Sequence, residues 1–355
     1  KNYVGARKNE IRPFTGYKMP VVNSATYRVV RYPAESPQHP GGAPSLHTDP
    51  WTMAPGNATT LKWHNDGIVE HDSTRGNNVY AAEDRNNTNS VIDKAAVSQT
   101  PQPTLTFDYA PDFTQAPTVT TPPNQQFNIT NLFYMNNIMH DIVYQYGFNE
   151  VSGNFQKDNM GRGGLGNDHV FGDAQDGGGT NNANFATPAD GSNPRMQMYI
   201  WTAANPDRDG DVDNGIIAHE FGHGISNRLT GGPANSGCVG NAEHGGEGWS
   251  DYYALMVTTN WATATVTDGA LPRPIGTYAV NQPVTGGGIR NFPYSTNMAI
   301  NPLVYSTSLP SQVHNRGEYW CMALWEMTWA MIQQNGINPN LFNPNTYEIS
   351  FNGTI

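Results

Sequence analysis

Residues 213–223 of this 355-residue chain read Asp-Asn-Gly-Ile-Ile-Ala-His-Glu-Phe-Gly-His, which contains the pattern His-Glu-x-x-His. On a helix, residues four apart lie one above the other, so His219 and His223 can bind one metal ion together. Glu220 follows the first histidine and can hold a water molecule without binding the metal itself. This stretch therefore predicts a metal-binding helix that carries a general base.

The residues around the motif favour a helix over 214–229. Apolar side chains recur at helical spacing, and Asn214 is a candidate N-cap. Gly222 and Gly224 each lower helix stability by roughly 1 kcal/mol relative to alanine. Glycine this close to both histidines predicts that another element packs tightly against the helix.

A second helix, expected at 246–260, supplies a candidate third ligand. Glu247 would complete a set of two nitrogens and one oxygen, which leaves the fourth tetrahedral position for water, as catalytic zinc requires. Asp251, one turn along, can accept the N–H of His219 and fix its tautomer. Without a metal, Glu247 would be an acidic residue at a helix N-terminus and Asp251 a solvated one. The histidine motif upstream favours the zinc site.

Outside the motif, hydrophobic periodicity predicts strands first and helices later along the chain. The strand-like segments are residues 25–30, 104–109 and 195–201, and further helices are expected at 129–146 and 314–335. The last helix is the most apolar, so we expect it to be buried on most sides. This order of elements predicts an α+β fold of two lobes.

Two irregular segments have compositions that suggest a role. The glycine-rich stretch 161–179 is too long for an ordinary connection and is a candidate functional loop. Aspartates alternate at Asp207, Asp209, Asp211 and Asp213 as in calcium loops, but the glycine and glutamate that complete an EF-hand are missing. We expect a solvated turn that caps the motif helix, and a Ca²⁺ site stays open as the alternative.

The composition excludes several classes of protein. With 19 Lys+Arg against 30 Asp+Glu, the net charge is −11, which argues against a nucleic-acid or anionic-membrane partner. No run of 18 apolar residues occurs, so we expect no membrane span. The chain is sparsely charged (14%) and rich in aromatic residues, as suits an extracellular globular protein. Two cysteines, Cys238 and Cys321, are too few for a disulfide framework, and their pairing stays open.

Several separate segments resemble the fungalysin family of zinc metalloendopeptidases. They are GIIAHEFGHGISNRLTGGPANSGCV from Gly215, GEGWSDYYA from Gly246, FYMNNIMHDIVYQYGFNEVSGNFQ from Phe133, AQDGGGTNNANFATPADGSNPRMQMYIW from Ala174, GGIRNFPYSTNMAINPLVYS from Gly287 and VHNRGEYW from Val313. The resemblance covers about residues 129–334. It implies a thermolysin-like architecture, with a β-rich N-terminal lobe (1–218) and a second lobe (219–355) formed by the active-site helix and further helices.

The resemblance also implies the roles of the site residues. His219, His223 and Glu247 correspond to the zinc ligands, and Glu220 corresponds to the general base. His314, in the segment VHNRGE, corresponds to a histidine that stabilises the tetrahedral intermediate of peptide hydrolysis. The alternative for His314 is an ordinary residue at a helix N-terminus.

Substrate contacts are less clearly indicated. Asn182 and Ala183 lie where thermolysin-like enzymes present an edge strand that pairs with the substrate backbone, although a loop before the next strand is equally compatible with the sequence. Arg290 is expected to support the site or to bind a substrate carbonyl. The tyrosine that thermolysin places between its histidines and its third ligand has no counterpart here, so Tyr294 and Tyr305 are candidates for a second oxyanion donor.

The resulting prediction is a secreted zinc endopeptidase that hydrolyses peptide bonds in proteins. Two alternatives stay open: a catalytically inactive zinc-binding relative that acts as a protein-binding module, and a hydrolase of a non-peptide bond. The resemblance also implies an inhibitory pro-segment that is removed before Lys1. It further implies that the helical lobe continues beyond Ile355, either on the same chain or as a separate C-terminal fragment.

Overall fold

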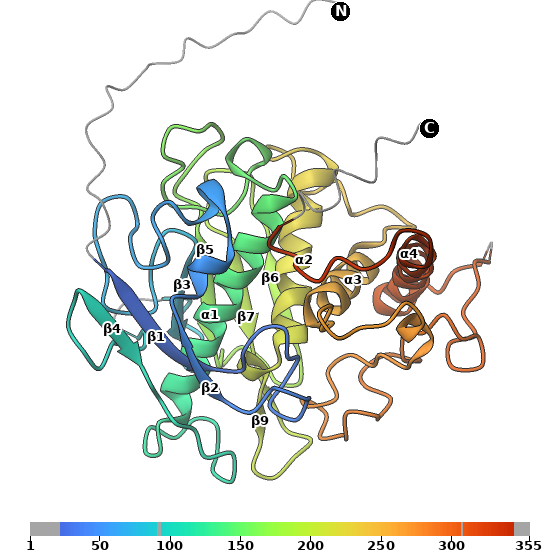
Figure 1. Cartoon of the computed structure of the whole chain (residues 1–355), viewed down its shortest axis with the longest axis horizontal. Helices are drawn as coiled ribbons and strands as arrows, with labels where there is room; N and C mark the ends of the chain where they lie inside the picture. Colours follow the sequence, from blue (N-terminus) through green and yellow to red (C-terminus); the bar gives the residue numbers. More distant parts are fainter. Residues whose placement is uncertain (1–21, 91–93, 307, 344–355) are drawn as a thin grey trace, which may run out of the picture.

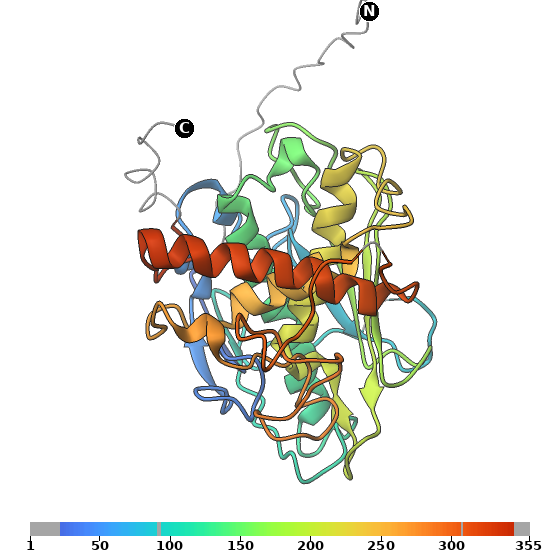
Figure 2. The same cartoon turned by 90° about the vertical axis from the view of Figure 1, so that its right-hand side faces the viewer.

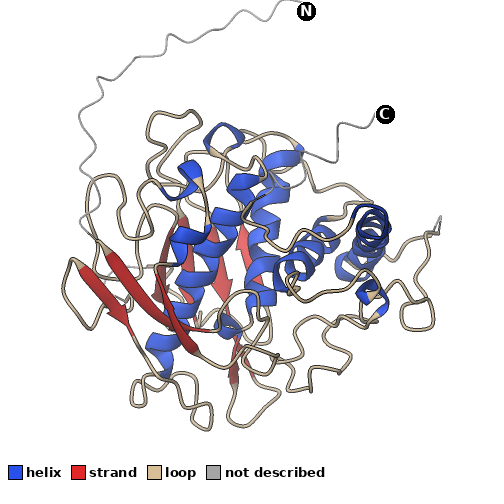
Figure 3. Cartoon of the chain, in the orientation of Figure 1, coloured by secondary structure: helices blue, strands red, loops and turns tan. Residues whose placement is uncertain are grey.

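The computed structural model describes residues 22–90, 94–306 and 308–343 (Figure 1). The helices are α1 (Asn124–Gln145), α2 (Asn214–Thr230), α3 (Gly246–Thr258) and α4 (Val313–Asn335). The strands are β1 (Ser24–Val29), β2 (Ser45–Thr48), β3 (Val79–Glu83), β4 (Thr104–Phe107), β5 (Val170–Ala174), β6 (Ala183–Ala186), β7 (Arg195–Met198), β8 (Ile200–Trp201) and β9 (Arg208–Asp209). Helices α3 and α4 lie on the side away from the strands (Figure 3), which confirms the α+β class.

Two larger sheets and a two-stranded sheet, β8-β9, form the strand-rich part of the described residues. One has the order β2-β1-β4 and the other the order β3-β5-β7-β6. In the second sheet β3, β5 and β7 are parallel, whereas β6 runs antiparallel to β7 and forms an edge. Strand β5 lies inside the stretch 161–179, so the prediction that this whole stretch is a loop is wrong. The reason is packing: Gly172 lies where β5 meets Leu132 of α1, and a Cβ there would be 3.2 Å from the leucine side chain.

Helix α1 is buried along most of its length and packs against β1, β3, β5 and α2. Its asparagines hold the segment that leads into α2. Nδ2 of Asn128 donates to Oδ2 of Asp209 across 2.6 Å. Nδ2 of Asn131 donates to the carbonyl oxygen of Asp211 (2.8 Å) and to Oδ1 of Asn214 (3.0 Å). Because buried polar groups require hydrogen bonds, these contacts determine where α2 begins.

The predicted motif helix is confirmed as α2, but its N-cap differs from the prediction. Oδ1 of Asp213 accepts hydrogen bonds from the backbone N–H groups of Gly215 (3.1 Å) and Ile216 (3.2 Å). Asn214 is instead the first helical residue, and its Nδ2 donates to two carbonyl oxygens in the segment 30–34. The amide of Asn214 therefore joins α2 to the segment that follows β1.

The tight packing expected at the two glycines of α2 is confirmed. A Cβ on Gly222 would lie 3.0 Å from the Cα of Ser250 in α3. A Cβ on Gly224 would lie 2.7 Å from the rings of Phe155 and Phe185. The glycines thus bring α3 on one side and β6 on the other close to the histidines.

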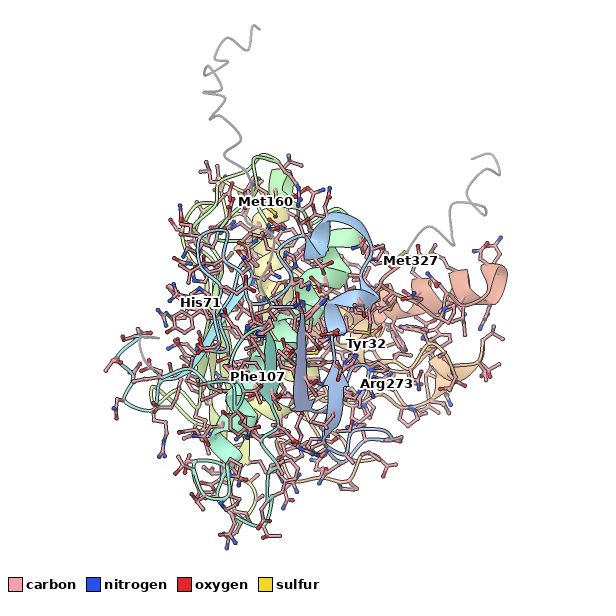
Figure 4. All side chains as sticks on the ribbon, turned by 60° about the vertical axis from the view of Figure 1, so that its left-hand side comes forward. Tyr32, His71, Phe107, Met160, Arg273 and Met327 are labelled. Atoms are coloured by element: carbon pink, nitrogen blue, oxygen red, sulfur yellow. The ribbon has the colours of Figure 1, made fainter. Side chains whose placement is uncertain are left out.

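Helix α4 is buried on one face only, so the prediction that it is buried on most sides is wrong. Trp325 and Trp329 face the core, whereas Trp320, Met327 and Met331 are 36%, 50% and 42% exposed. Figure 2 shows α4 along the face of the molecule that is turned toward the viewer, and Figure 4 labels Met327 on it. Apolar residues occur all around this helix, and hydrophobicity alone therefore did not identify its buried side.

The predicted division into lobes 1–218 and 219–355 places its boundary inside α2. One hydrophobic core extends from α1 through α2 to α4, and it includes Phe133, Phe221 and Trp325. The α+β class is established, whereas the division into lobes stays a prediction.

Two further expectations concern cysteine chemistry and the membrane. Cys238 is exposed and Cys321 is buried, and both thiols are free, so they do not pair with each other. None of the helices in the described ranges has both the length and the apolar composition that a bilayer crossing requires.

Candidate metal centre

Three side chains from two adjacent helices converge at one point. His219 and His223 lie one turn apart on α2, and their Nε2 atoms are 3.1 Å from each other. Glu247, in the first turn of α3, places Oε2 at 3.2 Å from Nε2 of His219 and 3.6 Å from Nε2 of His223. The sequence motif and the second helix therefore meet as predicted from their spacing.

The donor set and its spacing fit a zinc ion. Tetrahedral zinc with bonds of about 2.0–2.2 Å places its ligand atoms about 3.4 Å apart, close to the three separations observed here. Oε2 of Glu247 is buried and has no hydrogen-bond partner. Two imidazole nitrogens and a carboxylate oxygen that face one another in this way need a cation between them.

The charges around His219 also favour a cation at this point. Burial lowers the pKa of the imidazole, but the adjacent carboxylates of Asp251 and Glu247 outweigh it and raise the pKa to about 10. In Glu247, burial raises the pKa of the carboxyl, whereas His219 and His223 hold it well below its usual range. The site thus stabilises positive charge on the nitrogen side and negative charge on the oxygen side.

Asp251 lies one turn after Glu247 and orients His219 from behind. Its Oδ1 accepts the Nδ1–H of His219 across 2.7 Å. Arg290 donates from Nε to Oδ2 (2.7 Å) and from Nη2 to Oδ1 (2.8 Å), and the hydroxyl of Tyr294 also donates to Oδ2. A carboxylate with these donors remains an acceptor and holds a proton on Nδ1 of His219, so that a metal ion that displaces the proton of Nε2 would bind the nitrogen that faces Glu247.

Glu220 lies beside the histidines with a free carboxylate oxygen. It is 5% exposed, and its Oε2 has no hydrogen-bond partner. Burial raises the pKa of the carboxyl, and the neighbouring His219 and His223 partly offset this. A buried carboxylate with a raised pKa and an unoccupied oxygen has the properties of a general base.

His314 approaches the same point from the first turn of α4. Its Nε2 is 3.3 Å from Oε2 of Glu247. This approach depends on two glycines at the crossing of α3 and α4: a Cβ on Gly248 would lie 1.9 Å from the carbonyl oxygen of Gly317. Burial lowers the pKa of His314, although Glu247 partly offsets this. The structure thus places His314 in the same cleft as Glu220.

The converging side chains lie in a cleft of about 360 Å³. Its lining comprises Asn182, Ala183, Asn184, Phe185, Trp201, Ile216, His219, Glu220, His223, Asn227, Glu247, Ile275, Ile289, Arg290 and His314. Ala183 begins the edge strand β6, so the alternative that this segment is a loop is wrong. Asn182, Ala183 and Arg290 all line the cleft, in addition to the contact that Arg290 makes with Asp251.

Neither tyrosine candidate for a second oxyanion donor lies in the cleft. Tyr294 is fully buried and its hydroxyl is bound to Asp251. Tyr305 is 73% exposed and lies beside α4, in a separate pocket. Two other features were not predicted from the sequence. One is the apolar wall that Ile216, Ile275 and Ile289 form in the cleft. The other is the pair of hydrogen bonds that Gln312 makes with His314 and Asn315, for which the position of Gln312 at the start of a helix was the available signal.

The aspartate-rich segment before α2 is not a solvated turn, as the sequence suggested. Asp209, Asp211 and Asp213 are buried, and only the expected capping role of Asp213 is confirmed. Asn128 and Gln175 donate to the carboxylate of Asp209, and the backbone N–H of Gln175 donates to that of Asp211. The N–H groups at the start of α2 donate to the carboxylate of Asp213. Within the described residues, the only other group placed to share an ion is Asp84, Asp173 and Asp176, where Arg195 and Lys94 already form ion pairs. The possible Ca²⁺ site at the aspartates thus has no support.

Comparison with known proteins agrees with this geometry. A family profile for the fungalysin metallopeptidases (M36) matches residues 26–353. Extracellular metalloproteinase 2 of Trichophyton tonsurans is 42% identical over 325 residues, which cover 90% of this chain and 48% of that protein. Extracellular metalloproteinase 2 of Arthroderma gypseum is 40% identical over 346 residues (96% and 51%), and extracellular metalloproteinase 3 of T. tonsurans is 43% identical over 321 residues (89% and 47%). The chain spans about half the length of the curated relatives it matches. On the family match and these identities, it belongs to the fungalysin family of metallopeptidases.

Proposed function

We propose that this chain is the catalytic part of an extracellular zinc endopeptidase. The observation that carries the proposal is the convergence of His219, His223 and Glu247 within 3.6 Å of one another, beside the buried Glu220 in an open cleft. Membership of a metallopeptidase family supports the reaction class. The names of the relatives, which are extracellular metalloproteinases, support the location.

The ligands of the zinc ion would be His219, His223 and Glu247. When bound, zinc would polarise the scissile carbonyl and lower the pKa of a water molecule toward 7. Asp251 holds the Nδ1–H of His219, so the nitrogen that faces the ion keeps its lone pair. The carbonyl of the substrate and the attacking water would both lie between Glu220 and His314.

Proton transfer is assigned to Glu220. Its free Oε2 accepts a proton from the attacking water and passes it to the departing amine. The raised pKa of this carboxyl suits a group that must take up a proton and release it in one reaction. On the opposite side, the Nε2–H of His314 donates a hydrogen bond to the oxygen on which negative charge develops.

The substrate is proposed to be a protein or peptide in an extended conformation. Strand β6 is an edge of its sheet and lies along the cleft, so a peptide can add to it as a further strand through Asn182 and Ala183. The side chains of Ile216, Ile275 and Ile289 form an apolar wall that favours an apolar substrate residue. The edge strand and the apolar wall together favour an extended peptide as substrate over a small ester, the substrate expected of a hydrolase of a non-peptide bond.

The inactive zinc-binding relative is less favoured because Glu220 is present and its carboxylate is free. Digestion of casein would be measured before and after zinc is removed with a chelator and then restored. Loss and recovery of digestion support the proposal. Zinc-loaded protein that does not digest casein would support the binding module, and cleavage of esters alone would support the other hydrolase. The expected pro-segment and C-terminal fragment concern Lys1 and Ile355, which lie outside the described residues.

A further inference from the structure

Asp251 is held by three donor residues from two separate parts of the chain. It is only 1% exposed, and it accepts hydrogen bonds from His219 of α2, from Arg290 and from Tyr294. Burial of a carboxylate is costly unless its oxygens are hydrogen bonded. The position of Asp251 therefore depends on all three donors.

The two oxygens of Asp251 divide these donors between them. Oδ1 accepts from Nδ1 of His219 and from Nη2 of Arg290. Oδ2 accepts from Nε of Arg290 and from the hydroxyl of Tyr294. Without the hydroxyl, Oδ2 would keep one donor, and Arg290 and His219 alone would hold the carboxylate. The hydroxyl of Tyr294 thus supplies one of the two donors to Oδ2.

The backbone of Tyr294 is held independently of its hydroxyl. Its N–H donates to the carbonyl oxygen of Arg273, and its carbonyl oxygen accepts the N–H of Arg273, both across 2.9 Å. The ring is fully buried in the core. Removal of the oxygen atom alone should leave the ring and the backbone where they are, so the effect of the hydroxyl can be measured by itself.

We propose that Tyr294 is a positioning residue of the metal site, which acts through Asp251 to hold His219 in the orientation that binds zinc. This inference rests on the proposed zinc site. Tyr294 does not reach the cleft, so it has no contact with the substrate. Partners behind a ligand histidine commonly change metal affinity by about 10–100-fold when they are removed.

The test compares the zinc dissociation constants of Tyr294→Phe and Tyr27→Phe by chelator competition. Tyr27 is the matched control because it is also fully buried and its hydroxyl contacts buried His64 (2.6 Å) far from the site. Both substitutions should lower the melting temperature. Only Tyr294→Phe should weaken zinc binding, by about 10–100-fold. Equal zinc affinity in the two variants would overturn the proposal.

A double-mutant cycle with Asp251→Asn separates action through Asp251 from a general loss of stability. If Tyr294 acts through Asp251, Tyr294→Phe should change zinc affinity less than 3-fold in the Asp251→Asn background. Full additivity of the two effects would overturn the proposal. Wild-type protein that binds no zinc would instead refute the proposed function, so the two failures can be distinguished.

Discussion

Gln312 donates from Nε2 to Nδ1 of His314 across 2.7 Å, while Oε1 of the same amide accepts the backbone N–H of Asn315 across 2.8 Å. The contact with Asn315 determines which end of the amide is the donor. Because an amide NH₂ group cannot accept a hydrogen bond, Nδ1 of His314 must be the acceptor, and its proton lies on Nε2. Nε2 is the nitrogen that faces Glu247 and the cleft.

This relationship predicts the protonation of His314 directly. In nitrogen-15 NMR spectra of the zinc-loaded protein near pH 8, His314 should be neutral with its proton on Nε2. Gln312→Glu replaces the donor with an acceptor and should put a proton on Nδ1 as well, since the added charge favours the imidazolium form. A wild-type spectrum with the proton on Nδ1 would contradict the assigned donor.

Substitution of one ligand should remove the metal. We expect His223→Ala to lose stoichiometric zinc and all proteolysis, because one nitrogen and one carboxylate oxygen cannot hold zinc against buffer. Zinc content is measured by metal analysis after dialysis. His71→Ala serves as the control, since His71 pairs with Asp66 outside the cleft. A His223→Ala protein that still contains about one zinc per chain would refute the ligand assignment.

The crossing of α3 and α4 should be sensitive to a single methyl group. A Cβ on Gly317 would lie 2.5 Å from the backbone nitrogen of Gly248 and 2.6 Å from Cβ of Glu247, so Gly317→Ala must push the helices apart. A displacement of His314 by about 1 Å would lower kcat roughly 100-fold, and metal analysis distinguishes this from a loss of zinc through a displaced Glu247. Kinetics and metal analysis are compared with Met327→Ala, which alters the exposed face of the same helix. An unchanged kcat in Gly317→Ala would contradict a role of His314 in the reaction.

Asp213 should make folding stability depend on pH. Burial and the charge of Glu35 raise the pKa of its carboxyl well above the usual value. Its contribution is complete below the pKa of the unfolded chain, about 3.9, and declines as the pH rises toward the folded pKa. Asp213→Asn resembles the protonated form and keeps the oxygen that caps Gly215 and Ile216.

The Asp213→Asn variant should therefore match the wild type near pH 4 and be more stable than the wild type near pH 8, where the buried carboxyl of the wild type is driven to ionise. Unfolding in urea at both pH values measures the difference. Asp207→Asn is the control, because it removes one negative charge at an exposed position. A wild type that gains stability relative to Asp213→Asn between pH 4 and pH 8 would contradict the raised pKa.

Local patterns predicted the parts of this molecule that depend on local geometry. The spacing of His219 and His223 determines that both face one side of a helix, and glycine at Gly222 and Gly224 predicted close neighbours. The proposed third ligand, Glu247, could be predicted because it lies in the first turn of the next helix. In each case the residues that meet are separated by one helical turn or by one connection.

Features that depend on distant partners could not be predicted in this way. Tyr294 contacts Asp251 from an irregular segment 43 positions away, and nothing in its neighbourhood indicates that partner. The aspartates before α2 have the composition of a solvated turn, yet Asn128 and the distant Gln175 donate to the buried carboxylate of Asp209. The buried face of α4 depends on which elements pack against it, since its apolar residues surround the helix.

The most direct test of the account is Glu220→Gln. Glutamine preserves the shape of the side chain but cannot accept the proton of the attacking water, and general bases commonly contribute about 10²–10⁴-fold to the rate. Zinc content and casein digestion are measured on the same preparation. We predict about one zinc per chain, as in the wild type, with digestion lowered by at least about 100-fold. Digestion close to the wild-type rate by the zinc-loaded variant would contradict the assignment of Glu220 as the general base.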